Sequence, residues 1–170
     1  MLKIIDNIRQ LNFSDLMLVY EESNLTSGGE RYPGMSEFNR LREAEQDFYQ
    51  YLRSLFFKQQ NASYAVWEEN QHYVSAVRLE PYQDGLLLCA LETAPDFRRK
   101  GYARNMLHAL QEHLLGEKLY SHVAKINTAS LELHKSCGFH TIKDYAAFID
   151  GSISHDSVTM LYECKKAESM

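Results

Sequence analysis

The stretch that decides the fold runs from residue 86 to residue 103 and reads LLLCALETAPDFRRKGYA. Residues 86–93 are mostly apolar and stand between Gly85 and Pro95. Because this run is too short for a globular helix, it predicts a strand buried on both faces. Basic residues follow, and an apolar stripe then predicts a helix over 101–115 that ends at Gly116. The stretch therefore predicts a strand that enters a helix through a short basic turn.

Hydrophobic periodicity extends this unit in both directions. Helical patterns cover 12–23 and 36–58, and the segment between them, 24–34, holds two structure-breaking Gly and Pro pairs. The remaining patterns predict strands at 63–68, 73–79, 119–126, 139–148 and 158–164, a turn at 81–85 and a short helix at 128–137. The order βααβββαβαββ predicts an α/β (α+β) protein. We expect a mixed, mostly antiparallel sheet of about six or seven strands with helices on both faces.

Composition narrows the classes of function. A chain of 170 residues predicts a single domain over 1–170, and a net charge of −5 disfavours a general nucleic-acid binder. The longest apolar run has six residues, and the N-terminus lacks the pattern of a signal peptide, so we expect no membrane association. The cysteines at 89, 137 and 164 have neither zinc spacing nor a disulfide framework. We therefore expect no metal and a reduced, cytoplasmic compartment.

The basic turn before the helix predicted over 101–115 carries the strongest chemical signal. Unpaired N–H groups and the positive end of the helix dipole make a helix start an anion site, and Gly101 and Ala103 let a phosphate approach the backbone. Arg98, Arg99 and Lys100 add positive charge. A solvated basic helix start is the alternative. The chain has neither GxxxxGK[ST] nor GxGxxG in this region, which argues against ordinary nucleotide loops.

Two blocks resemble one known superfamily. Arg98-x-x-Gly101-x-Ala103 is similar to the pyrophosphate loop of the GNAT acyl-CoA-dependent N-acyltransferases, (Arg/Gln)-x-x-Gly-x-(Gly/Ala). The segment from Asn127 to Phe139, with Ser130, Leu133, His134 and Gly138 at the expected spacing, resembles that family's Asn-x-x-(Ala/Ser)-x-x-Leu-Tyr-x-x-x-Gly-Phe block. The resemblance covers about 63–164 and implies the GNAT fold, with acetyl-CoA as acyl donor.

The resemblance also implies positions for the donor. Leu91, Glu92 and Thr93 fall where the family's strand offers backbone groups to the pantetheine arm, as an added strand would pair. Asn127 falls where the cofactor arm is contacted, and a simple N-cap of the next helix is its alternative role. Besides Arg98, the residues that fall at the pyrophosphate are Arg99, Lys100, Gly101, Tyr102, Ala103 and Arg104.

Amine acylation needs a proton acceptor. Glu92 is the only acidic residue in an otherwise apolar strand, and a buried Glu has the raised pKa that suits a base. A strand-end Glu that faces water or pairs with Arg is the alternative, and Glu80 is a weaker candidate for the base.

The proton donor to the departing thiolate would be His134, which stands where the family has Tyr. A surface or packed histidine is the alternative role. We expect no site from the remaining histidines.

The resulting interpretation is an N-acetyltransferase that moves acetyl from acetyl-CoA to a primary amine of a small molecule or peptide in a ternary complex. We expect a monomer or homodimer, and the acidic net charge favours a cationic acceptor. One alternative is a non-catalytic acyl-CoA-binding sensor or partner-binding module. Another is a hydrolase that uses Cys137 or Cys89. Residues 24–34 would form an acceptor-site lid or a plain surface loop.

Overall fold

The main sheet confirms the predicted mixed architecture. The computed structural model describes residues 1–163, so Cys164, at the end of the last predicted strand, lies outside the described residues. Within residues 1–163 the sheet has seven strands in the order β1-β2-β3-β4-β5-β9-β6, and only β4 and β5 pair in parallel. These strands are β1 (Leu2–Ile5), β2 (Ser63–Glu69), β3 (His72–Tyr82), β4 (Gly85–Thr93), β5 (Lys118–Ala124), β6 (His140–Lys143) and β9 (Ser157–Glu163).

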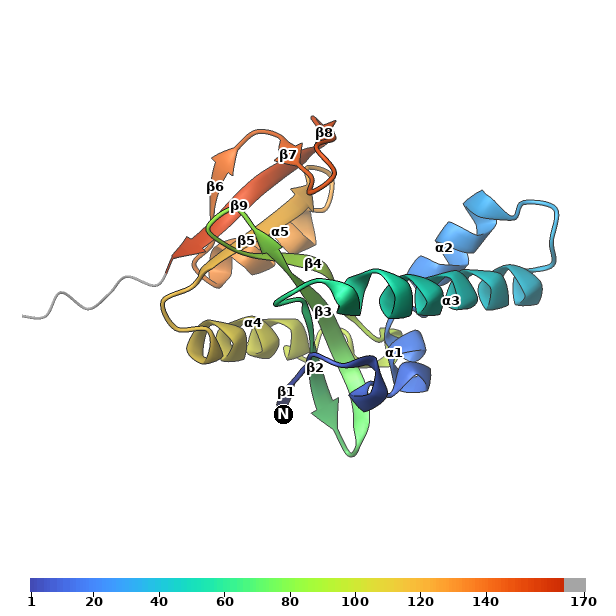
Figure 1. The fold of residues 1–170 in the computed structure, drawn as a ribbon. Coiled ribbons are helices and arrows are strands. Elements are labelled where there is room, and N and C mark those ends of the chain that lie inside the picture. Colours follow the sequence, from blue (N-terminus) through green and yellow to red (C-terminus); the bar gives the residue numbers. More distant parts are fainter. Residues whose placement is uncertain (164–170) are drawn as a thin grey trace, which may run out of the picture.

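Helices cover both faces of the sheet, as predicted (Figure 1). On one face lie α1 (Phe13–Val19), α2 (Glu21–Arg31) and α3 (Glu37–Ser54), and a core around Leu16, Leu52 and Tyr64 joins α1 and α3 to the sheet. On the other lie α4 (Tyr102–His113) and α5 (Thr128–Ser136). Short 3₁₀ turns occupy Ile8–Gln10, Phe56–Lys58 and Pro95–Phe97, and a small hairpin pairs β7 (Ala146–Ala147) with β8 (Ile153–Ser154).

The prediction of a loose segment at 24–34 is wrong over most of its length. Helix α2 runs through Gly28 and Gly29 to Arg31, and the helix expected over 12–23 is instead divided at Tyr20. A Cβ added at Gly28 would lie 2.6 Å from the carbonyl oxygen of Arg40 in α3. The glycine therefore allows the two helices to touch backbone to backbone, and this packing outweighs its low helix propensity.

Two predicted boundaries also change. The strand expected over 139–148 is divided, because β6 pairs with β9 only as far as Lys143, through an irregular register, before the chain enters the β7–β8 hairpin. Strand β3 continues through Pro81, where a turn was expected. Pairing between β2 and β3 ends where Ser63 lies opposite Leu79. Pro81 therefore lies beyond the end of this pairing, where β3 has a free edge, and an edge strand tolerates proline.

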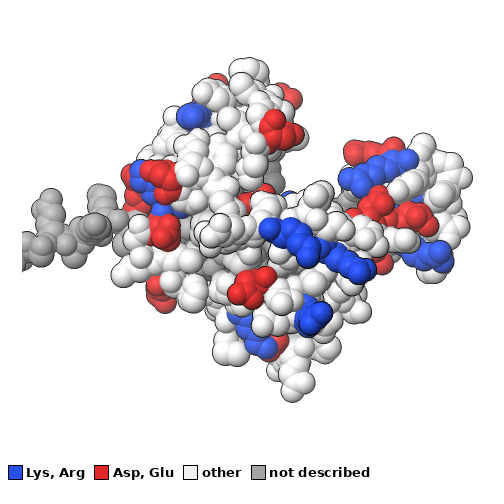
Figure 2. Space-filling view, viewed as in Figure 1, with Lys and Arg blue, Asp and Glu red and all other residues white. Residues whose placement is uncertain are grey.

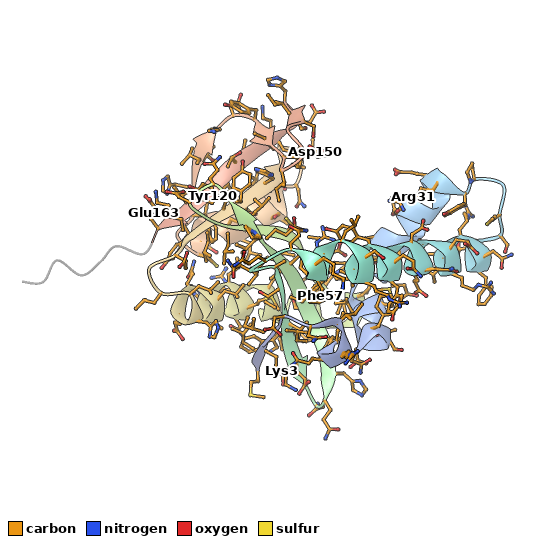
Figure 3. The ribbon with its side chains drawn as sticks, in the orientation of Figure 1. Lys3, Arg31, Phe57, Tyr120, Asp150 and Glu163 are labelled. Atoms are coloured by element: carbon orange, nitrogen blue, oxygen red, sulfur yellow. The ribbon has the colours of Figure 1, made fainter. Side chains whose placement is uncertain are left out.

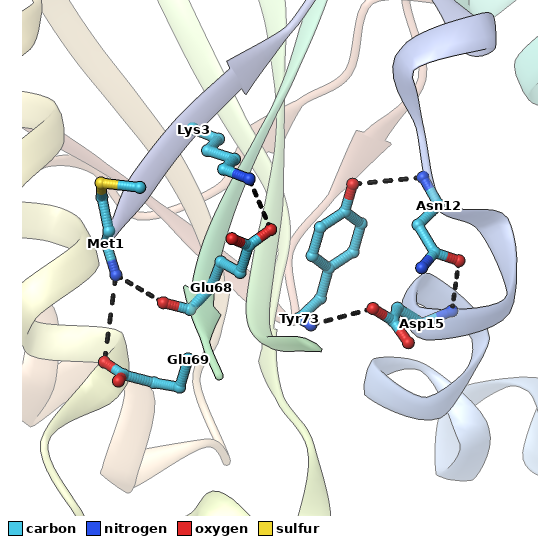
Figure 4. Close-up of polar contacts among 7 residues, drawn as sticks. All are labelled: Met1, Lys3, Asn12, Asp15, Glu68, Glu69 and Tyr73. Carbon is cyan, nitrogen blue, oxygen red and sulfur yellow. Dashed lines mark hydrogen bonds and ion pairs between the residues drawn. The ribbon is translucent and has the colours of Figure 1, made fainter. Parts of the chain in front are cut away.

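Hydrogen bonds tie the N-terminal segments to the β2–β3 hairpin (Figure 4). The amino group of Met1 donates to the Glu68 carbonyl at 2.6 Å. The backbone N–H of Asn12 donates to the Tyr73 hydroxyl at 3.1 Å, and the N–H of Tyr73 donates to Asp15 at 3.4 Å. These contacts fix the start of α1 against the sheet. Within the described residues, no helix is long and apolar enough to cross a membrane.

The second half of β4 separates from β5. The prediction of a strand buried on both faces over 86–93 is therefore wrong for this half. Leu87 and Leu88 are buried, whereas Ala90 is exposed and has a φ of +53°. Pairing with β5 ends at Leu88 opposite Ser121, and the register with β3 shifts at the same level. The result is a bulge, which leaves backbone groups without ladder partners. This splay between β4 and β5 positions the site.

Candidate functional site

A cavity of about 510 Å³, here called the α4 cavity, lies where β4 leads into α4. Gly101 is the N-cap of α4, with a φ of +85° and no capping side chain. The N–H groups of the first helical turn are therefore available to an anion, and the helix dipole favours one there. The cavity is lined by Thr93, Phe97, Arg98, Arg99, Gly101, Tyr102, Ala103, Arg104, Ala129 and Leu133.

The basic side chains around this cavity divide into two kinds. Arg98 donates from Nε to the Thr93 carbonyl at 3.0 Å and forms an ion pair with Glu22 at 2.7 Å, and Lys100 donates to the Asp96 carbonyl at 2.9 Å. Arg98 and Lys100 therefore hold the backbone of the loop between β4 and α4. In the described part of the chain, Arg99 and Arg104 form no ion pair or side-chain hydrogen bond, which leaves two cations for a ligand.

Four residues that the resemblance places at the donor do not line the α4 cavity: Leu91, Glu92, Lys100 and Asn127. Asn127 is the N-cap of α5, because its Oδ1 accepts from the Ser130 N–H at 3.1 Å. This confirms the N-cap role and leaves the coenzyme contact a prediction.

A second cavity, of about 610 Å³, lies on the opposite face of the sheet between α3 and the β7–β8 hairpin, and is here called the hairpin cavity. The space-filling view shows a notch between the hairpin and the arm formed by α2 and α3 (Figure 2). Basic and acidic side chains alternate on the surface of that arm. Asp150 on the hairpin and Arg31 on α2 lie on either side of that notch (Figure 3). The lining residues are Tyr51, Arg78, Glu80, Leu87, Leu88, Cys89, Ala90, His122, Phe148, Ile149 and Asp150.

A buried carboxylate, Glu80, lies in the hairpin cavity. Its Oε1 accepts from the Tyr51 hydroxyl at 3.3 Å and lies 3.3 Å from Nε of Arg78. The Arg78 guanidinium also covers the Tyr51 ring, 5.3 Å from its centroid. Tyr51 and Arg78 thus hold Glu80 by one of its two oxygens.

The histidine that lines this cavity, His122, was missed by the sequence analysis. The ring lies edge-on to Tyr82 and Phe148, at centroid distances of 5.4 and 5.1 Å. Both ring nitrogens are buried, and within residues 1–163 neither has a hydrogen-bond partner. Burial lowers the pKa of His122, and Lys143 lowers it further. The signal that could have found His122 is a titratable side chain within the strand predicted over 119–126.

Glu92 has the raised pKa expected of it, but it is not fully buried and lines neither cavity. It is half-buried and accepts a short hydrogen bond from the Ser23 hydroxyl of α2. Burial raises the pKa of Glu92, while the bond from Ser23 and the charge of Arg98 oppose that rise. Its neighbour in the bulge, Ala90, is held through its carbonyl by the Tyr20 hydroxyl at 2.7 Å.

The other predicted catalytic residue, His134, lies within the core. Its side chain packs edge-on to Phe139, and the residue is 2% exposed. Because Nδ1 lies 2.8 Å from the Ser130 carbonyl, which can only accept, Nδ1 carries the proton and Nε2 has no partner within residues 1–163. Burial lowers the pKa of His134. The structure therefore does not bring His134 and Glu92 together on one cavity.

The cysteines of the hydrolase alternative are poor nucleophiles. Burial, with Glu80 beside it, raises the pKa of Cys89 to about 12, and burial also raises that of Cys137. The thiolate is the reactive form, and it is scarce under these conditions. Among the described residues, no three His, Cys, Asp or Glu side chains gather as a metal site.

Known proteins resemble this chain in sequence and in architecture. The model of the Acetyltransferase (GNAT) family matches residues 29–139. The bS18-alanine N-acetyltransferase of Haemophilus ducreyi is 29% identical over 136 residues, which span 74% of this chain and 94% of that protein. The ribosomal-protein-S18-alanine N-acetyltransferase from Escherichia coli superposes with a TM-score of 0.62 at 19% identity, over 100% of this chain and 99% of that one.

A third relative was solved with coenzyme A. The PaiA N-acetyltransferase from Thermoplasma acidophilum has a TM-score of 0.58 at 15% identity, over 96% of this chain and 99% of that one. The family match takes in most of this chain, including β4, the basic loop and α4. This chain belongs to the GNAT acetyltransferase family and is an acyltransferase.

Proposed function

We propose that the protein transfers an acetyl group from acetyl-CoA to a primary amine, by direct attack within a ternary complex. The observation that carries the proposal is the pair of cavities on opposite faces of the sheet. Both border β4, through Thr93 in the α4 cavity and Ala90 in the hairpin cavity. Donor and acceptor can therefore approach the splay from opposite sides without competing for space.

The α4 cavity is the proposed donor site. The first-turn N–H groups of α4, with Arg99 and Arg104, would take the pyrophosphate of acetyl-CoA. Residues 91–93 follow the point where β4 loses its partner β5, so their backbone groups can pair with the amides of the pantetheine arm. Asn127 at the start of α5 would contact the same arm.

The hairpin cavity is the proposed acceptor site, for a small-molecule or peptide amine. A peptide N-terminus is supported by two relatives that are named for alanine N-acetylation of a ribosomal protein. Glu92 stays the proton acceptor predicted from the sequence.

A proton donor to the thiolate must be protonated before it acts, which gives His134 a testable signature. Because the pKa of His134 is lowered, its cationic form is lost as the pH rises through a value below the ordinary 6.5. We expect kcat to decline along this alkaline limb, and His134→Phe to lower kcat and remove the limb. The measurement is kcat against pH with saturating acetyl-CoA. Superimposable profiles for the two proteins would remove His134 from the reaction.

The donor assignment predicts that acetyl-CoA stabilises the folded protein. At a concentration 100-fold above its Kd, a ligand that binds only the native state adds about 2.7 kcal/mol to the free energy of unfolding. The measurement is a thermal melt with and without acetyl-CoA, with adenosine as the control ligand. Mass spectrometry of an N-terminal alanine peptide follows the transfer. A melt unmoved by acetyl-CoA would contradict the proposal, and a shift without acetylated product across an amine panel would favour the non-catalytic binding module.

A further inference from the structure

Among the described residues, one of the two carboxylate oxygens of Glu80 has no hydrogen-bond or ion-pair partner. In that part of the chain, the two polar contacts of this carboxylate, from Tyr51 and from Arg78, both fall on Oε1. Within residues 1–163, Oε2 forms no hydrogen bond or ion pair, and it is not among the buried polar atoms that lack a partner. Glu80 as a whole is 7% exposed and lines the hairpin cavity. A carboxylate oxygen left open in such a cavity favours a cationic ligand.

The imidazole of His122 lies in the same cavity, at the mouth of the splay. Pairing between β4 and β5 ends at Ser121, so His122 is the first residue of β5 past it. Buried polar groups in native proteins nearly always have partners, and an exception calls for an explanation. Within residues 1–163, two unpartnered nitrogens on one ring call for such an explanation, and a ligand in the adjoining cavity would supply it.

We propose that the hairpin cavity binds the ammonium group of the acceptor, that Glu80 holds it, and that His122 takes a proton from it. This inference rests on the proposed function and deepens it, because it assigns the acceptor's chemical class and a proton acceptor other than Glu92.

The proton balance is simple. The ammonium R–NH₃⁺ gives one proton to a ring nitrogen of His122 and becomes R–NH₂. The amine nitrogen then attacks the thioester carbonyl carbon, the new C–N bond forms, the C–S bond breaks and the sulfur keeps the electron pair. The second N–H proton ends on the CoA thiolate, and the proton on His122 leaves to solvent. The products are R–NH–CO–CH₃, CoA–SH and one proton.

The groups that face His122 decide which protonation state it holds before the amine arrives. Glu80 and Asp150 line the same cavity and carry negative charge, and Arg78 carries positive charge. Tyr82 and Phe148 cover the ring edges, Cys89 lies on β4, and Lys143 acts from β6. Burial and Lys143 together lower the pKa of His122. The imidazole is therefore neutral at pH 7 and free to accept a proton.

The cavity walls indicate what else the acceptor carries. Leu87, Phe148 and Ile149 present apolar surface around the two titratable groups. Phe148 and Ile149 are exposed on the hairpin, so nothing in the described chain covers their outer sides. An amine attached to an apolar body would bury this surface on binding, whereas a short polar amine would leave it in water.

The first experiment measures kcat against pH for the wild type, His122→Gln and the control His113→Gln, with phenethylamine as acceptor and saturating acetyl-CoA. His113 is exposed on α4, away from both cavities. We expect the wild-type kcat to rise with pH along an acid limb as His122 loses its proton, below the ordinary pKa, so that with the alkaline decline assigned to His134 the profile is bell-shaped. His122→Gln should lower kcat by about 10²–10⁴-fold and abolish this limb. His113→Gln should keep it.

Glu92→Gln, measured in the same series, separates the two assignments. An acid limb that disappears in Glu92→Gln and persists in His122→Gln would overturn the proposal. An acetyl-CoA melting shift equal to that of the wild type shows that His122→Gln is folded. His122→Phe, whose ring suits the slot between Tyr82 and Phe148, serves as a second test should the glutamine variant not fold.

The role of Glu80 is tested by a split between KM and kcat. Glu80→Gln should raise the KM for phenethylamine at least about tenfold and change kcat less than KM, since a group that holds the ammonium acts on binding. The control Glu112→Gln removes an exposed charge from α4. An unchanged KM in Glu80→Gln would overturn the assignment. A wild type without amine acetylation would be a failure of the proposed function, whereas an active wild type with inert substitutions would be a failure of this inference alone.

Discussion

A glutamate in place of Gly101 is expected to abolish the stabilisation of the protein by acetyl-CoA. Gly101 is the N-cap of α4 and has a φ of +85°, and a Cβ there would have no heavy atom within 4 Å. The side chain therefore fits, but it brings a negative charge to the point where the helix dipole and Arg99 attract an anion. The gain of about 2.7 kcal/mol expected at 100-fold the Kd should fall close to zero.

Backbone strain needs its own control, because any side chain at a positive φ costs about 1–2 kcal/mol. Gly116 just past α4 has a φ of +92° and equally open surroundings. Gly116→Glu should therefore lower the melting temperature of the free protein about as much as Gly101→Glu does. It should nevertheless retain the full acetyl-CoA shift in the same thermal melt. Equal shifts in the two variants would contradict the placement of the donor.

Alanine in place of Gly85 is expected to have the largest effect on stability. A Cβ at Gly85 would lie 2.2 Å from the Lys118 carbonyl oxygen of β5 and 2.9 Å from its carbonyl carbon. Backbone atoms in a sheet cannot move aside cheaply, so β4 and β5 would have to separate where their short parallel pairing begins. We expect the free energy of unfolding to fall by about 3 kcal/mol, the upper range for overpacking.

Urea denaturation measures this loss, and Gly34→Ala provides the control. A Cβ at Gly34 would meet nothing within 4 Å, and that residue has no positive φ. Its substitution should change stability by less than about 0.5 kcal/mol. Similar urea midpoints for the two variants would show that β4 and β5 can part at Gly85 without cost.

Local chemistry explains which parts of the fold could be predicted. The strand–turn–helix unit around Gly101 is defined by apolar period and by residues close in sequence, and it is confirmed. Helix α2 was missed because Gly28 reads as a breaker, and its reason for being helical is the backbone of Arg40 in α3. The sequence around Gly28 does not show which backbone will pack against it, so this contact could not be predicted.

The same distinction divides the candidate site. The α4 cavity is built mainly from one continuous segment, so the basic loop could be recognised from its motif. The hairpin cavity combines Tyr51 of α3, Glu80 of β3, His122 of β5 and Phe148 beside β7. These residues lie far apart in the sequence and come together only in the folded sheet. Strand patterns could place Glu80 and His122 on strands, but not on one cavity.

The position of the two cavities on opposite faces has a consequence for how such a protein diversifies. The proposed donor side depends on the backbone of a helix start, which tolerates little change. The proposed acceptor side, the hairpin cavity, is lined by Tyr51 of α3 and by the β7–β8 hairpin, where Phe148 and Ile149 are exposed. Substitutions at Phe148, Ile149 or Asp150 can therefore reshape acceptor choice while the donor loop stays intact. We therefore expect single substitutions there to change which amine is acetylated while acetyl-CoA binding is kept.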